Sequence, residues 1–233
     1  MKKILILFLF IPLFSCNDWL NVEPEDSVTF VNYFKSEEEL KALHNGIASY
    51  MKNICIGKQP YFYNALDADN IEWTYQGFWT LDPDTYLPDE SMVLDVNWSG
   101  FYDAIYMANV MIENEYRFEN ISEERAKFWL GQAHFCKAMS YFRIAQIWGD
   151  APIAKGSESI APEGKRPALE VLEEAIREAK LALTLPVYEE LKDVDGKQIT
   201  SKQYASLGTV NTLLANIYAW MGGLTQEEKY WTE

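Results

Sequence analysis

The sequence has 233 residues, 48% of them hydrophobic and 24% charged, which is enough apolar chain for one large or two small globular domains. Its net charge of −15 argues against nucleic acid as a partner, because contact with phosphates requires a basic surface. Aromatic residues make up 15% of the chain and include 8 Trp and 14 Tyr, which favours a surface that stacks on a ligand in addition to an aromatic core.

Residues 1–15 have the pattern of a secretory signal peptide, with two Lys followed by an apolar run too short to span a bilayer. The motif Leu13-Phe14-Ser15-Cys16 is similar to a lipobox, in which a small residue precedes a Cys that is acylated, for example with palmitate. Phe14 is bulkier than the usual residue there, so an ordinary signal peptide cut near Ser15 is the alternative. We predict lipid attachment at Cys16 and a stable membrane tether.

Residues 16–35 read as an acidic tether or solvated linker, since Asp18, Glu23, Glu25 and Asp26 are clustered there. A capping box at Ser36 then opens an amphipathic helix that we predict over residues 36–52.

Residues 53–97 are interrupted by Gly and Pro and lack sustained periodicity, and a loop of this length inside a domain is usually functional. Within it, residues 67–79 combine aromatic and polar side chains. Sugars bind by laying their C–H faces on aromatic rings while polar side chains bond their hydroxyls. The residues we predict to contact a glycan are Trp73, Tyr75, Trp79, Asp67, Asp69 and Asn70. For each ring, covering the helical core is the alternative.

An enzymatic interpretation rests on Asp67, Asp69, Asp82 and Asp84, since a glycosidase needs two carboxylates at a fixed separation. Nothing in the sequence positions a specific pair, and no nucleophile elbow, phosphate loop or metal motif is present. We therefore predict a protein that is not an enzyme and that uses no cofactor or metal.

Helical periodicity returns over residues 98–116, and residues 122–148 form the longest predicted helix. Ser122 is suited to its N-cap, and Gly149 and Pro152 favour its end. We expect these two helices to pair antiparallel. The predicted apolar stripe of the longer helix consists of Leu130, His134, Ala138, Tyr141, Ala145 and Trp148.

A connector is predicted over residues 153–166, and a third long helix then runs from Pro167 to Pro186. Its predicted stripe consists of Leu169, Leu172, Ile176, Ala179 and Leu183. Residues 193–196 predict a tight turn between two short strands, and a fourth helix begins near Ser201 and ends at Gly222-Gly223. The resulting hairpins, 98–148 and 167–221, predict a mainly α, tetratricopeptide-like fold with long irregular loops.

The run Gly131-Gln-Ala-His-Phe-Cys-Lys-Ala-Met-Ser-Tyr-Phe142, followed by Trp148-Gly-Asp-Ala-Pro-Ile153, resembles the signature helix of the SusD/RagB family. The resemblance extends to residues 17–26, to the first helix and to residues 213–218, so it covers nearly the whole chain. Proteins of that family are considerably longer. We therefore expect residues 36–233 to be the N-terminal helical region of such a protein, truncated at the C-terminus.

This resemblance implies a lipoprotein on the outer membrane, exposed at the cell surface, that binds a glycan and works with a TonB-dependent, SusC-like transporter in polysaccharide uptake. It also places the nutrient site in loops before the second helix, where residues 67–79 lie. The alternative function is a helical-repeat scaffold that binds a protein and no glycan, although such a scaffold has no need of an aromatic-rich loop.

Two interpretations remain open for the other cysteines, Cys55 and Cys136. An even pair in an exported protein is compatible with a disulfide. Cys136, however, falls where the SusD/RagB family usually has an apolar residue, which favours two buried thiols.

Overall fold

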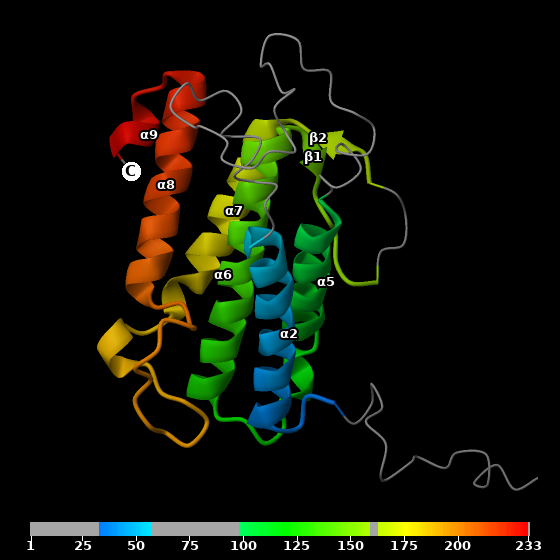
Figure 1. Ribbon diagram of the computed structural model, residues 1–233, viewed down its shortest axis with the longest axis vertical. Coiled ribbons are helices and arrows are strands. Elements are labelled where there is room, and N and C mark those ends of the chain that lie inside the picture. Colours follow the sequence, from blue (N-terminus) through cyan, green and yellow to red (C-terminus); the bar gives the residue numbers. More distant parts are fainter. Residues whose placement is uncertain (1–32, 57–97, 159–162, 233) are drawn as a thin grey trace, which may run out of the picture. The chain divides into compact units, whose positions relative to one another are not determined.

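The computed structural model describes residues 33–56, 98–158 and 163–232, which are mostly helical (Figure 1). The helices are α2 (Glu37–Ile56), α5 (Ser99–Glu113), α6 (Glu123–Trp148), α7 (Ala168–Leu181), α8 (Leu207–Thr225) and α9 (Lys229–Thr232). The connections contain the 3-10 helices η3 (Glu115–Arg117), η4 (Ala182–Thr184) and η5 (Tyr188–Glu190) and the strands β1 (Ala151–Pro152) and β2 (Lys165–Arg166). From Phe34 onward the described residues belong to one compact unit. The predicted mainly α class is confirmed.

Helices α2 and α6 begin at the predicted caps. The backbone N–H of Ser36 donates to Glu39 Oε2 at 2.9 Å, and the N–H of Glu39 donates to Ser36 Oγ at 3.4 Å. Ser122 Oγ accepts from the N–H of Arg125 at 3.3 Å. These bonds satisfy N–H groups that have no partner inside the first helical turn. Helix α6 ends at Gly149, whose φ of 70° favours glycine.

Helix α6 is the central helix, because it packs against α2, α5 and α7 and also touches α8. Its buried large apolar residues are Phe128, Trp129, Tyr141, Phe142 and Ile144. They lie on all sides of the helix axis, whereas Leu130, His134 and Trp148 of the predicted stripe are half-buried. The prediction of a single stripe was wrong, because neighbouring helices enclose α6 from several directions.

Helices α2, α5 and α6 form an antiparallel series, as predicted for the α5–α6 pair (Figure 1). Their shared core includes Leu40 and Ile47 from α2 and Phe101 and Ile105 from α5, all at most 2% exposed. The C-terminus of α2, the N-terminus of α5 and the C-terminus of α6 consequently lie at the same end of the helices (Figure 1).

Helix α7 packs on α6 and on α8, and Pro167 is its N-cap residue. Its buried apolar residues are Val171, Leu172, Ala175, Ile176 and Ala179. Two residues of the predicted stripe do not belong to this face, since Leu169 is 37% and Leu183 is 39% exposed. Leu183 leaves the face because the α-helix gives way to the tighter η4 after Leu181. We find no structural reason for the exposure of Leu169.

Helix α8 begins later and ends later than predicted. Residues 201–206 are not helical, and the helix starts after Ser206, which forms a capping box with Thr209. It then continues through Gly222 and Gly223 to Thr225 and ends at Gln226 in the left-handed region. Gly222 does not end the helix but allows α9 to pack closely against it, because a Cβ there would lie 2.6 Å from the Trp231 ring of α9.

Short β elements occupy two connections. The segment predicted as a plain connector contains β2, which pairs antiparallel with β1 through Ala151 opposite Arg166. The predicted tight turn is present: Asp193 Oδ1 accepts from the N–H of Lys197 at 2.8 Å, and Gly196 has a φ of 76°. An isolated antiparallel bridge between Lys192 and Gln198 closes this turn.

The close contact at Gly131 yields a stability prediction. A Cβ at Gly131 would lie 2.8 Å from Cγ and Cδ2 of Leu185, which is 2% exposed. We expect Gly131→Ala to lower the free energy of unfolding by about 1–3 kcal/mol, because overpacking outweighs the gain in helix propensity. Equilibrium unfolding in urea measures this change.

Gly223→Ala is the matched control, since Gly223 also lies within a helix and a Cβ there would meet nothing within 4 Å. It is expected to raise the free energy of unfolding by roughly 0.5–1 kcal/mol. An equal increase for Gly131→Ala would contradict the packing argument.

Candidate functional site

The sequence-predicted ligand residues lie outside the described residues, so they stay predictions. They are Trp73, Tyr75, Trp79, Asp67, Asp69 and Asn70, together with Cys16 and the carboxylates Asp82 and Asp84. The structure does describe the two points at which the stretch containing them joins the helical unit. Helix α2 ends at Ile56 before it, and Trp98 follows it.

An aromatic group occupies the point where this stretch joins α5. The Trp98 ring centroid lies 5.9 Å from that of Tyr102 and 6.0 Å from that of Trp148, at the end of α6. Nζ of Lys165, in β2, lies 5.3 Å from the Trp98 ring centroid. All three rings are half-buried, so they form a partly open aromatic surface held by α5, α6 and β2.

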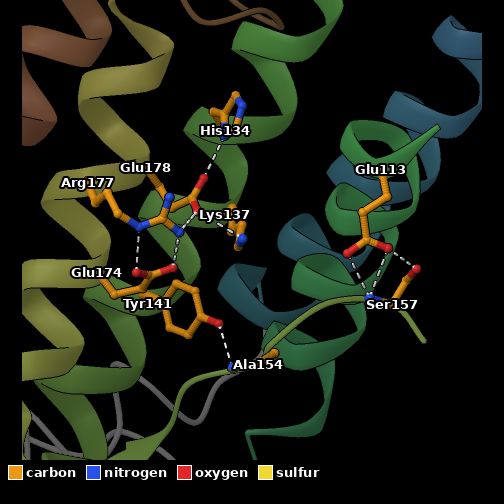
Figure 2. Close-up of polar contacts among 9 residues, drawn as sticks. All are labelled: Glu113, His134, Lys137, Tyr141, Ala154, Ser157, Glu174, Arg177 and Glu178. Atoms are coloured by element: carbon orange, nitrogen blue, oxygen red, sulfur yellow. Dashed lines mark hydrogen bonds and ion pairs between the residues drawn. The ribbon is translucent and has the colours of Figure 1, made fainter. Parts of the chain in front are cut away.

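The segment after β1 is fixed by side chains of α5 and α6 (Figure 2). Tyr102 Oη donates to the carbonyl of Pro152 at 2.6 Å, and Tyr141 Oη accepts from the N–H of Ala154 at 3.0 Å. The Glu113 carboxylate accepts from the N–H of Ser157 at 3.1 Å and from its hydroxyl. Burial raises the pKa of Tyr102 to about 12, so both tyrosines stay neutral and keep these bonds at physiological pH.

A buried charge cluster joins α6 to α7 (Figure 2). Glu178, whose side chain is 1% exposed, lies 2.6 Å from His134 Nδ1 and 2.9 Å from Lys137 Nζ. Arg177 contacts Glu178 and also Glu174, each at 2.5 Å. Burial alone would raise the pKa of Glu178, but the hydrogen bond from His134 and the Lys137 charge outweigh it and lower that pKa to about 2.

This cluster was not predicted from the sequence, although the sequence carries a signal for it. Glu178 sits between Ile176 and Ala179 on the apolar face of α7, and Lys137 lies three residues after His134 on α6. A charge on a buried face needs a partner, because leaving it unpaired costs several kcal/mol. The cluster therefore holds α7 against α6, and each of its charged side chains is paired with another side chain of the protein.

One hollow adjoins the N-terminal end of α6, and another adjoins the middle of that helix. The first, of about 540 Å³, is lined by residues of α6 that include Glu124, Arg125 and Lys127 and by Glu189 and Glu190 of η5. The second, of about 460 Å³, lies between η5 and the start of α8.

Arg125 fixes the rim of the first hollow. Its guanidinium bonds Glu37 of α2 at 2.5 Å, donates to the carbonyl of Lys192 at 3.0 Å and lies 4.4 Å from the Phe128 ring centroid. The same Glu37 oxygen accepts from Trp129 Nε1 at 2.9 Å. Because its guanidinium contacts both Glu37 and the carbonyl of Lys192, Arg125 joins α2 and α6 to the segment at Lys192.

Cys136 is a buried free thiol, as predicted, and burial raises its pKa to about 12. The side chain of Cys55 lies outside the described residues, so its state stays a prediction. The described residues contain no group of three or more His, Cys, Asp and Glu side chains able to hold a metal ion. Within the same ranges, no helix is both long enough and apolar enough to cross a bilayer.

The class of protein follows from this architecture: antiparallel α-helical hairpins of tetratricopeptide-like type, with loops fixed by buried side chains. Residues 18–222 match the model of the SusD-like family, described as starch-binding and associating with the outer membrane. The chain belongs to this family, which confirms the resemblance inferred from the signature helix.

Individual relatives agree with this assignment. The chain is 25% identical to SusD-like protein P25 of Formosa agariphila over 159 residues, 64% of this chain and 30% of that protein. It is 26% identical to SusD-like protein P2 of the same species over 228 residues, 94% of this chain and 43% of that protein. A SusD homolog from Bacteroides thetaiotaomicron superposes with a TM-score of 0.67 at 21% identity, over 87% of this chain and 40% of that one. The chain thus spans less than half the length of these relatives.

The charge cluster yields a prediction for the dependence of stability on pH. Because the folded-state pKa of Glu178 is about 2 against an ordinary value of 4.5, its stabilising effect is complete above pH 4.5 and disappears as the pH falls towards 2. In Glu178→Gln, which leaves Lys137 buried without its carboxylate, we expect a loss of about 3–5 kcal/mol at pH 7. Urea unfolding at pH 7, 4.5 and 3 measures both effects.

The readout is the difference between the two proteins, which should shrink towards low pH as wild-type Glu178 becomes protonated. Glu173→Gln is the matched control, because Glu173 lies on the exposed face of the same helix and should change stability by less than about 0.5 kcal/mol. A difference that is the same at pH 7 and pH 3 would contradict the assigned pKa.

Proposed function

We propose that this protein binds a glycan at the outer membrane and does not chemically alter it. The observation that carries the proposal is the match of residues 18–222 to a family described as starch-binding and associating with the outer membrane. Because the chain spans less than half of its relatives, the proposal concerns the part of a glycan site that residues 1–233 supply.

Capture is proposed to depend on aromatic stacking. Trp73, Tyr75 and Trp79 would stack on sugar rings, while the neighbouring Asp67, Asp69 and Asn70 bond the hydroxyls. The half-buried rings of Trp98 and Trp148 support this assignment, because they lie where the 57–97 stretch joins α5.

Delivery completes the proposed function. A lipid on Cys16 would tether the protein to the outer membrane, facing the cell exterior, with residues 16–35 as the acidic tether. The captured glycan would then pass to a TonB-dependent, SusC-like transporter. Binding followed by transfer needs no catalytic group, which is consistent with a protein that is not an enzyme.

Glycan binding is tested by thermal unfolding in the presence of a panel of plant, host and microbial glycans. A ligand at about a hundred times its dissociation constant should add about 2.7 kcal/mol to the free energy of unfolding and raise the midpoint. With a neutral glycan, the shift should disappear in Trp73→Ala/Trp79→Ala. It should persist in Tyr106→Ala, which removes a ring that is 52% exposed on α5.

The lipid anchor is tested by metabolic labelling with an alkyne analogue of palmitate. We expect label on the wild-type protein and on Cys55→Ser, and none on Cys16→Ala, because only the Cys at the processed N-terminus is acylated. Label retained in Cys16→Ala would refute attachment at this position.

A helical-repeat scaffold is the second candidate, and one observation favours it. Trp220 and Leu224 of α8 are 40% and 55% exposed and thus form an apolar edge suited to a protein partner. A cooperative melt that no glycan shifts would favour this function over glycan capture.

A further inference from the structure

The second hollow has the composition of a site for a small ligand. It opens between η5, residues 202–206 and the first turns of α8, and its volume of about 460 Å³ is typical of small-molecule sites. Its rings and principal polar groups come from Phe135, Tyr188, Tyr204, Lys202, Gln203 and Thr212. Aromatic faces beside hydroxyl, amide and ammonium groups are the combination that a sugar ring requires.

The walls of this hollow are held in place by buried hydrogen bonds. Gln132 of α6, which is 1% exposed, donates to the carbonyl of Ala205 at 2.8 Å and accepts from its N–H at 2.9 Å. Tyr188 Oη donates to the carbonyl of Thr200 at 2.8 Å. Because the backbone is already ordered, a ligand would pay little conformational entropy on binding.

The charge of the hollow differs from that of the rest of the chain. The protein carries a net charge of −15, yet no carboxylate is among the described residues that line this hollow. Nζ of Lys202 lies 3.3 Å from the Tyr188 ring centroid, at the wall of the hollow. In the neighbouring hollow, Glu124, Glu189 and Glu190 are balanced by Arg125, Lys127 and Lys192. Lys202 is the one charged side chain among the described residues that line this hollow, so its local charge favours a ligand that carries negative charge.

We propose that this hollow binds an anionic sugar unit, either a hexuronate or a sulfated hexose. The sugar ring packs on the aromatic side chains of the hollow, and its carboxylate or sulfate accepts hydrogen bonds from Lys202 Nζ and the Gln203 amide. The inference rests on the proposed glycan function and extends it, since it assigns a second subsite and the charge of the sugar that occupies it.

Isothermal titration of the full chain with three oligosaccharides tests the assignment. The probes are a galacturonate trimer, a sulfated galactose oligomer and a neutral galactose oligomer of the same length. We expect at least one anionic oligomer to bind at least tenfold more tightly than the neutral one, and the anionic oligomer that binds identifies the charged group. Raising the salt concentration should weaken this binding, because salt screens the attraction between the exposed Lys202 ammonium and the anionic group of the sugar.

Two lysine variants locate the contact. Lys202→Met keeps the aliphatic stem and removes the charge, so it should weaken anionic binding about tenfold or more. Lys192→Met is the control, because Lys192 is also exposed but lines the other hollow. It should leave the affinity unchanged. Tyr188→Leu should weaken binding about fivefold by removing a stacking ring.

The Trp73→Ala/Trp79→Ala protein separates this inference from the proposed function. Anionic oligomers should bind to it as they bind to the wild type, because Lys202, Gln203 and the described aromatic side chains of the hollow are unchanged in it. Absence of anionic binding, equal binding of the neutral oligomer, or unchanged affinity in Lys202→Met would each overturn the inference. None of these results alters a Trp73- and Trp79-dependent shift in the thermal melt, which tests the proposed function alone.

Discussion

The structure depends on the enclosure of α6 by other helices. A helix packed against neighbours on several sides requires small residues where those neighbours approach, and Gly131 against Leu185 is one such contact. It also requires that every charge it buries is paired. Lys137 meets this condition through Glu178, so the ion cluster and the close packing both follow from the same enclosure.

Side chains of the helices also fix the loops, through bonds to backbone groups. Gln132 holds both backbone groups of Ala205, and Tyr141 and Glu113 hold Ala154 and Ser157. Loops with little secondary structure of their own thereby acquire defined positions. The hollow beside α8 and the aromatic group beside α5 both depend on such bonds, from Gln132 to Ala205 and from Tyr102 to Pro152.

This division of roles explains how one helical framework can serve different ligands. The framework carries the family signature in α6, whereas the aromatic rings and polar groups suited to a glycan lie in or beside connecting segments. Ligand preference can then change by substitution in those segments, while the core that positions them is preserved. The two hollows beside η5 illustrate such a difference within one chain, since carboxylates line the first and none is among the described residues that line the second.

The sequence by itself determined the mainly α class, the caps at Ser36 and Ser122, the turn at 193–196 and the family, because these depend on local spacing and on motifs. Only the tertiary structure decided that neighbouring helices enclose α6 from several sides, that α8 runs through Gly222, and that His134, Lys137 and Glu178 meet. The hollow beside α8 also needs the fold, since Phe135 lies more than fifty residues before Tyr188 and Lys202 in the sequence. Periodicity reports which residues share one face of one helix. It carries no information on how many neighbours enclose that helix or which loops meet beside it, because contacts between distant segments determine both.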